Sequence, residues 1–197
     1  MGRMSDSAPL DLETRTGWPD ELRLFLDRFP RAGWPPRAEI GAVTKFWLDI
    51  HDGFRGFAGK LDAATAGFRE QKVAPADFRS WFAPRLDMFL SHLNGHHQIE
   101  DYQYFPLFVA AEERLKRGFD ILENDHAVIH AAMDQLVEAA NGFLAIAPEN
   151  VDRLRFAGDA YADASDRLLR MLARHLDDEE DLIVPLILDR GEHGLGL

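Results

Sequence analysis

Two stretches of the chain share one pattern of histidine, acid and proline. Residues 96–107 read HHQIEDYQYFPL, and residues 175–186 read HLDDEEDLIVPL. In both, the first histidine is followed by a glutamate at the fourth position, a second acid at the fifth, and Pro-Leu at the tenth and eleventh. Residues four apart lie on the same face of a helix, so each histidine–glutamate pair can direct two polar atoms at one point. The repeat predicts two related helices that converge on one polar site.

Apolar residues recur at helical spacing through most of the chain, and no stretch alternates with the period of a strand. The spacing predicts long helices over residues 38–68, 75–111, 119–141 and 149–188. Pro84 and Pro106 are expected to bend the second helix, and the third could continue to Pro148. This pattern predicts an all-α, up-down-up-down four-helix bundle. A helical solenoid is the competing architecture, but it needs a much shorter repeat than the one observed.

Segments outside the bundle are short and polar. We predict an N-terminal arm with a short helix at residues 1–36, the bundle at residues 37–190, and a tail at residues 191–197. The short helix is expected near Glu21–Phe29, because Pro30 disfavours helix at the residue before it. Residues 1–18 are expected to be loose. Trp18 and Trp34 are expected to pack on the bundle or on a partner.

Composition excludes several classes of function. The chain has 197 residues, a net charge of −12 and no cysteine, so disulfides, thiolate metal sites and thiol nucleophiles are excluded. The acidic charge disfavours nucleic acid and anionic lipid as partners. Met1–Leu10 lacks the apolar segment of a signal peptide, and no apolar run approaches the roughly 18 residues that span a membrane. We therefore expect a cytoplasmic protein with no membrane or nucleic-acid partner.

Histidines and glutamates with metal-ligand spacing recur along the predicted helices. The candidate metal ligands are His51, His96, Glu100, His126, His130, His175 and Glu179. Burying so many polar groups is costly unless a cation occupies their centre. Nitrogen and oxygen ligands suit iron, manganese, nickel or zinc. Five histidines, two bridging carboxylates and one bridging oxygen would nearly fill two six-coordinate ions, leaving one position for a small ligand.

This pattern resembles the hemerythrin-like family, also called the HHE cation-binding domain, over about residues 38–188. The family motif has a histidine on the first helix, His-x-x-x-Glu on the second and His-x-x-x-His on the third. The fourth helix has a histidine followed by an acid. The resemblance implies two iron ions (Fe2+/Fe3+) with an oxo or hydroxo bridge. It assigns one iron to His126, His130 and His175, the other to His51 and His96, and the bridges to Glu100 and Glu179.

Two assignments within the motif have a neighbouring alternative. Oxygen carriers of the family place an aspartate five residues after the last histidine, where this chain has Glu180. The internal repeat favours Glu179 instead. His97 competes with His96, because His97 has Asp101 four residues after it. The repeat again favours the first residue of the pair.

Two further residues lie near the motif. Arg55 is four residues after His51, where the third helix has its second histidine. A cation there would steer an anionic ligand, or pair with a carboxylate. His92 precedes His96 by one turn and is expected to support a ligand or to lie at the surface. A ferritin-like di-iron site is disfavoured, because such sites are rich in carboxylates and use Glu-x-x-His.

The same set of predicted ligands is compatible with three alternative functions. The leading hypothesis is a di-iron protein that binds O2, or NO or peroxide, for oxygen binding or for redox or gas sensing. An oxidative enzyme that decomposes peroxide is the second, with Arg55, Tyr102 and Tyr104 as its sequence support. The third is an iron-responsive interaction module that uses the arm as its surface, with a protein partner that the sequence does not identify. A purified sample could carry other divalent metals, such as nickel or zinc, because occupancy follows availability.

Overall fold

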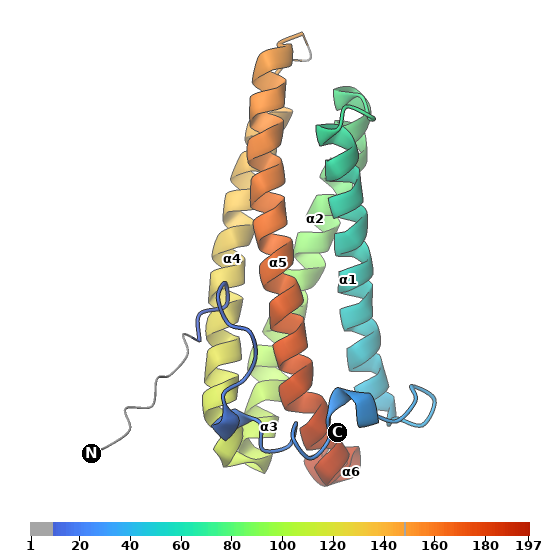
Figure 1. The fold of residues 1–197 in the computed structure, drawn as a ribbon, viewed down its shortest axis with the longest axis vertical. Helices are drawn as coiled ribbons and strands as arrows, with labels where there is room; N and C mark the ends of the chain where they lie inside the picture. Colours follow the sequence, from blue (N-terminus) through green and yellow to red (C-terminus); the bar gives the residue numbers. More distant parts are fainter. Residues whose placement is uncertain (1–9, 148) are drawn as a thin grey trace, which may run out of the picture. The chain divides into compact units, whose positions relative to one another are not determined.

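The chain forms an all-α bundle, as predicted. The computed structural model describes residues 10–147 and 149–197, in which no strand occurs (Figure 1). The long helices are α1 (Ala42–Arg69), α2 (Pro75–Ile99), α4 (Lys116–Leu144) and α5 (Val151–Arg190), and the short ones are α3 (Phe105–Ala111) and α6 (Glu192–Leu195). The first nine residues of the predicted arm, and Pro148, lie outside the described part. No helix in that part is long and apolar enough to cross a membrane.

The chain divides into two compact units. Unit 1 comprises the described residues of Met1–His51, Glu100–His126 and Ala173–Leu197. Unit 2 comprises Asp52–Ile99 and Ala127–Leu172. Each unit therefore takes one part of α1, α4 and α5, and the boundary in the second helical region falls between Ile99 and Glu100.

The arm contributes to the core of unit 1. Trp18, Leu22 and Phe25 are buried in a cluster with apolar residues of α1, α3, α4 and α5, among them Trp47, Phe105, Phe108, Phe119, Leu122, Leu182, Ile183 and Leu186. Leu12 and Arg15 are buried as well. The expectation of a loose segment is therefore wrong for Leu12–Trp18, because apolar burial fixes this stretch.

The short helix expected near Glu21–Phe29 is only a 3-10 turn, Asp20–Leu22, followed by further turns. A second 3-10 turn spans Arg31–Gly33. So short a segment gains little from helical hydrogen bonds alone, and here Leu22 and Phe25 are fixed by packing instead.

A π-helix interrupts the second helical region. Instead of one bent helix over residues 75–111, α2 ends at Ile99, a π-helical segment spans Glu100–Tyr104, and α3 begins at Phe105. Pro106 has no N–H to donate to the preceding turn, which favours such a local change of hydrogen bonding. The corresponding Pro185 lies inside α5, which remains α-helical to Arg190. The sequence repeat therefore does not extend to the local backbone.

Unit 2 has an aromatic core. Phe68, Phe78, Phe82, Phe143 and Tyr161 stack or meet edge to face, with ring centroids 4.6 to 6.3 Å apart. Gly158 permits this packing, since a Cβ there would lie 2.4 Å from the Phe68 ring.

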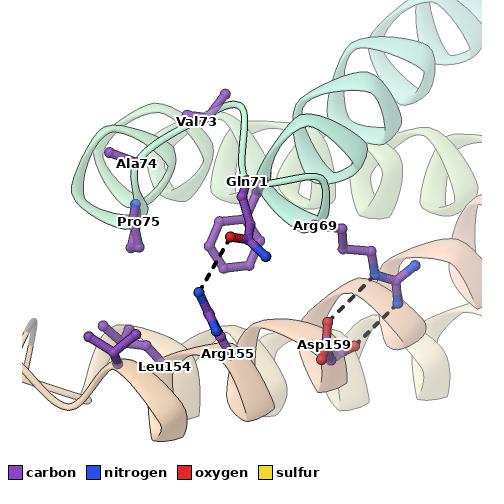
Figure 2. Close-up of a pocket in the computed structure, with 10 residues that line it drawn as sticks. Arg69, Gln71, Val73, Ala74, Pro75, Leu154, Arg155 and Asp159 are labelled. Atoms are coloured by element: carbon purple, nitrogen blue, oxygen red, sulfur yellow. Dashed lines mark hydrogen bonds and ion pairs between the residues drawn. The ribbon is translucent and has the colours of Figure 1, made fainter.

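A cavity of about 450 Å³ opens within unit 2 beside the α1–α2 turn (Figure 2). Its lining combines Phe68 and Leu154 with Arg69 and Arg155, and Arg155 donates to Gln71 Oε1 at 3.4 Å. None of the predicted metal ligands lines this cavity.

The C-terminal tail is folded against α1. Leu195 of α6 is buried in the core of unit 1. Glu192 accepts hydrogen bonds from Thr44 N at 2.7 Å and Thr44 Oγ1 at 2.8 Å. A carboxylate is favourable here because the first amide groups of a helix lack partners within it.

Candidate metal centre

Unit 1 gathers five of the predicted ligands. His51 comes from α1, Glu100 from the π-helix, His126 from α4, and His175 and Glu179 from α5. All five are at most 3% exposed. Buried histidines and carboxylates at this density require compensation by hydrogen bonds or by a cation.

Glu100 and Glu179 each lie between histidines. His51 Nε2 is 3.9 Å from Glu100 Oε1 and 3.5 Å from Glu179 Oε2. These three residues offer ligand atoms that lie within 4.8 Å of one another. The separations exceed those of charge-assisted hydrogen bonds, and they suit atoms that surround a common cation.

His126 and His175 also lie close to the glutamates, and their Nε2 atoms are 3.1 Å apart. His126 Nε2 is 3.5 Å from Glu100 Oε2, and His175 Nε2 is 3.6 Å from Glu179 Oε2. Glu100 thus presents one oxygen to His51 and the other to His126, which is the placement that a bridging carboxylate requires. Glu179 presents a single oxygen, Oε2, to both His51 and His175.

The electrostatics of this cluster also fit a cation. Neither oxygen of Glu179 accepts a hydrogen bond from the described part of the chain. Burial raises the pKa of Glu179 well above its usual value, and the adjacent carboxylate of Glu100 raises it further. Two carboxylates are held together here at a cost in free energy that a metal ion would offset.

The outer nitrogen of each imidazole faces an acid. His51 Nδ1 lies 3.1 Å from Glu180 Oε1, and His126 Nδ1 lies 2.7 Å from Asp101 Oδ1. His175 Nδ1 lies 3.5 Å from Asp125 Oδ2. The Nε2 atoms consequently face inward, and carboxylates behind metal-ligating histidines typically fix this orientation.

Glu180 and Asp101 therefore support histidines in this structure, while Glu179 and Glu100 point inward. We did not predict from the sequence that Asp125 supports a histidine, although its position directly before His126 places a carboxylate next to a predicted ligand. Nor did we predict the role of Arg15, which donates to Asp125 and to the buried Asp178.

Burial and neighbouring groups shift the pKa values of His175 and His51. Burial and the neighbouring His126 together lower the pKa of His175 to about 4, although the contact with Asp125 opposes this shift. His175 is thus a neutral imidazole at pH 7, the form that binds metals. Burial also acts to lower the pKa of His51, but its contacts with Glu100 and Glu180 outweigh that effect and raise it.

The other histidines of the motif belong to unit 2. His97 is buried, His96 is half-buried and His92 is exposed. His97 Nδ1 lies 3.0 Å from His130 Nε2, and the two rings stack. The His96 ring contacts Phe54, with centroids 5.0 Å apart.

Arg55, which was expected either to steer a ligand or to pair with a carboxylate, lies 3.7 Å from Asp52. Its side chain is 30% exposed. The structure thus shows the carboxylate pairing, between two residues of unit 2.

Comparison with known proteins agrees with the resemblance inferred from the sequence. The family model of the hemerythrin HHE cation-binding domain matches residues 42–187. No curated protein and no solved structure gives a match. The match covers α1, α2, α4, α5 as far as Ile187, and all seven predicted ligands. With its buried cluster of histidines and glutamates that could hold a metal, the chain belongs to the hemerythrin HHE cation-binding domain family.

Proposed function

We propose that this protein holds two iron ions and binds a small ligand there, with O2 as the first candidate and NO or peroxide as the others. Its role would be oxygen binding, or redox or gas sensing. The observation that carries the proposal is the position of Glu100 and Glu179, each of which is buried with a carboxylate oxygen within 3.9 Å of the Nε2 atoms of two histidines. A mixed set of imidazole and carboxylate ligands suits non-haem iron.

The proposed ligands follow the family motif. His126, His130 and His175 would hold one iron, His51 and His96 the other, and Glu100 and Glu179 would bridge. His97 is the alternative to His96. The iron pair, when bound, supplies electrons and an open coordination position for the small ligand.

Aromatic side chains would exclude water from this chemistry. Phe105 stacks on His126 at 5.5 Å, and Trp47 meets His51 edge-on at 6.0 Å. Trp47 in turn packs against Tyr104 and Phe108. An apolar wall of this kind protects a reactive centre from competing proton and water chemistry.

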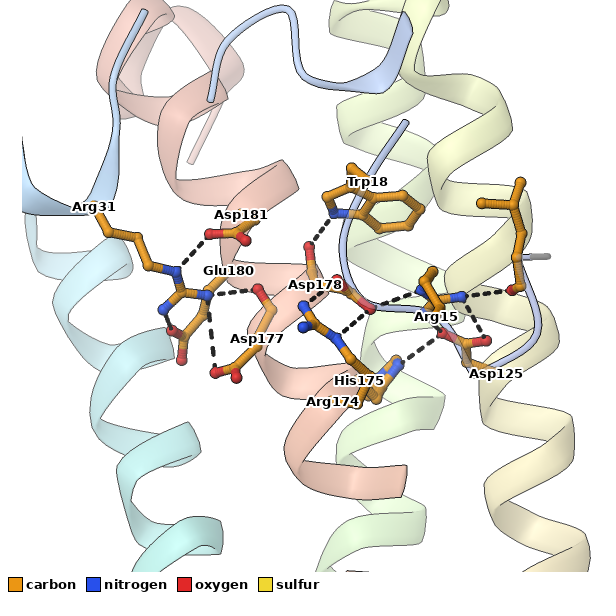
Figure 3. Close-up of polar contacts among 11 residues, drawn as sticks. Arg15, Trp18, Arg31, Asp125, Arg174, His175, Asp177, Asp178, Glu180 and Asp181 are labelled. Atoms are coloured by element: carbon orange, nitrogen blue, oxygen red, sulfur yellow. Dashed lines mark hydrogen bonds and ion pairs between the residues drawn. The ribbon is translucent and has the colours of Figure 1, made fainter. Parts of the chain in front are cut away.

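Acids behind the imidazoles would hold the ligand set ready for metal. Asp101 faces His126 Nδ1 and Glu180 faces His51 Nδ1, so each imidazole has a fixed orientation without the ion. Arg31 donates to Glu180 Oε2 at 2.7 Å and fixes that carboxylate in turn (Figure 3). Such preorganisation lowers the cost of ordering ligands when a metal binds.

The test is metal content and visible absorption of anaerobically reduced protein, before and after air. About two irons per chain, with a ligand-to-iron band that is reversed under vacuum, would support reversible oxygen binding. Irreversible oxidation with turnover of hydrogen peroxide above that of free iron would favour the oxidative enzyme instead. Absence of iron after anaerobic reconstitution would contradict the proposal.

Variants locate the site. Glu100→Ala and His130→Ala are expected to lose at least one iron and to change the spectrum. His193→Ala is the control, because His193 is exposed in the tail. If either ligand variant keeps two irons with an unchanged spectrum, its assignment as a ligand is wrong.

A further inference from the structure

Arg15 carries a positive charge from the arm into the interior of unit 1. Its side chain is 1% exposed. Its Nε donates to Asp178 Oδ2 at 2.7 Å, its Nη2 donates to Asp125, and its Nη1 donates to Leu10 O at 2.9 Å (Figure 3). Arg15 therefore joins the arm to α4, which carries Asp125, and to α5, which carries Asp178.

Asp125 connects this contact to a predicted metal ligand. Its Oδ2 binds Arg15 and also lies 3.5 Å from His175 Nδ1. The opposite nitrogen of that imidazole, Nε2, faces His126 and Glu179. The Asp125 side chain thus directly connects Arg15 of the arm with His175 of the candidate metal centre.

Further contacts fix the arm in this position. Trp18 Nε1 donates to the backbone oxygen of Asp178 at 2.8 Å, and the Arg15 guanidinium lies 5.0 Å from the Trp18 ring centroid. Arg174 also binds the Asp178 carboxylate, at 2.8 Å from Nε. A buried guanidinium between two buried aspartates is stable only while all three keep their partners. The position of Asp125 consequently depends on the docking of the arm.

We propose that the N-terminal arm is a strap that positions His175 for metal, with Arg15 as the positioning residue that acts through Asp125. The inference rests on the proposed function, because it assumes that His175 is a ligand. Coupling between two sites is reciprocal. A docked arm strengthens metal binding, and bound metal stabilises the docked arm by the same free energy.

The first test measures metal affinity in the full chain with Fe2+ and with Co2+, whose visible spectrum reports ligand geometry. Arg15→Lys keeps the charge but cannot reach both aspartates as a guanidinium does. We expect it to fold and to bind metal about 10- to 100-fold more weakly, as is typical when a supporting residue is changed. Arg23→Met is the control, since Arg23 lies in the same arm and pairs only with the exposed Asp27 within the described residues.

The second test needs no variant. Trypsin cleavage after Arg15 in the wild-type protein is compared with cleavage after Lys72, whose side chain is 73% exposed in unit 2. Metal is expected to slow cleavage after Arg15 several-fold and to leave cleavage after Lys72 unchanged. If Arg15→Lys fails to fold, this comparison still tests whether metal binding stabilises the docked arm.

The outcomes separate the two proposals. If wild-type protein takes up neither metal, the proposed function fails and the strap fails with it. If wild-type protein binds metal, but Arg15→Lys binds equally well with the same spectrum, only the strap is overturned. Equal cleavage after Arg15 with and without metal would overturn it as well.

Discussion

His51 Nε2 lies 3.5 Å from Glu179 Oε2, and both side chains are completely buried. At this distance the contact is weaker than a charge-assisted hydrogen bond, although the burial of both groups makes strong partners necessary. Glu100 Oε1 lies 3.9 Å from the same nitrogen. The cluster is therefore better suited to surround a cation than to stabilise the fold without one.

Neutralising Glu179 should have opposite effects on folding and on metal binding. In metal-free protein, Glu179→Gln removes one of two adjacent buried carboxylates, so we expect the free energy of unfolding to rise by about 1–2 kcal/mol. Metal affinity should fall at least about 10-fold, because an amide is a poor replacement for a carboxylate ligand. Urea unfolding with chelator, and metal titration, measure the two quantities.

The exposed Glu138→Gln on α4 is the control for loss of one negative charge. This variant should change neither the free energy of unfolding in chelator nor the metal affinity. A Glu179→Gln protein that is less stable than the wild type without metal would show that Glu179 serves the fold.

Metal removal should loosen unit 1 more than unit 2. A ligand that binds only the folded state stabilises it by about 2.7 kcal/mol at 100 times its Kd. Five of the seven predicted ligands lie in unit 1. Unit 2 holds the other two, His96 and His130, but its aromatic core around Phe82 and Tyr161 contains no predicted ligand. Hydrogen exchange with and without chelator should show the largest loss of protection at Glu100–Tyr104. Uniform loss over both units would indicate a single cooperative transition instead.

Glu112 should make the metal-free protein sensitive to acid. Hydrogen bonds from Arg114, at 2.6 and 2.7 Å, and from Arg190, at 2.8 Å, lower the pKa of Glu112 to about 2. Its ordinary value is 4.5, so this stabilisation is complete above about pH 4.5 and is lost as the pH falls through 2. Glu112→Gln should cost about 1–2 kcal/mol at neutral pH, since Arg114 is 62% exposed and partly screened.

The measurement is the difference in unfolding free energy between wild type and variant from pH 7 to pH 2, in chelator. That difference should shrink only below about pH 4.5. Glu113→Gln, at the exposed neighbouring position, should show no such pH dependence. A constant difference for Glu112→Gln across the whole range would disprove the assignment.

Periodicity was sufficient to predict the four long helices, because each buries one face and the spacing of that face is visible in the sequence. The histidine–glutamate pairs were visible for the same reason. The family match over residues 42–187 confirms the resemblance drawn from them. Periodicity did not predict the π-helical break at Glu100–Tyr104 or the loss of the short helix in the arm.

Contacts that arise only on folding were not predictable. Arg15 looks like one charged residue of a polar arm, and its burial depends on Asp125 and Asp178, which lie 110 and 163 residues further along the chain. Asp125 likewise supports His175 only because α4 and α5 pack together. Periodicity and spacing therefore predicted the fold class and the histidine–glutamate pairs, but not the residues that support them.

The π-helix allows a test of whether the local backbone orients Glu100 toward the candidate metal centre. Pro106→Ala restores an N–H that can donate to Tyr102, which should favour continuous α-helix through Glu100–Tyr104. Because a π-helical segment rotates the side chains that it carries relative to an α-helix, its loss should turn Glu100 away from His51 and His126. We expect a metal-free protein as stable as the wild type, with metal affinity about 10-fold weaker or more. Pro185→Ala in the α-helical α5 is the matched control and should leave affinity unchanged; equal metal affinity in both variants would show that the π-helix does not position Glu100.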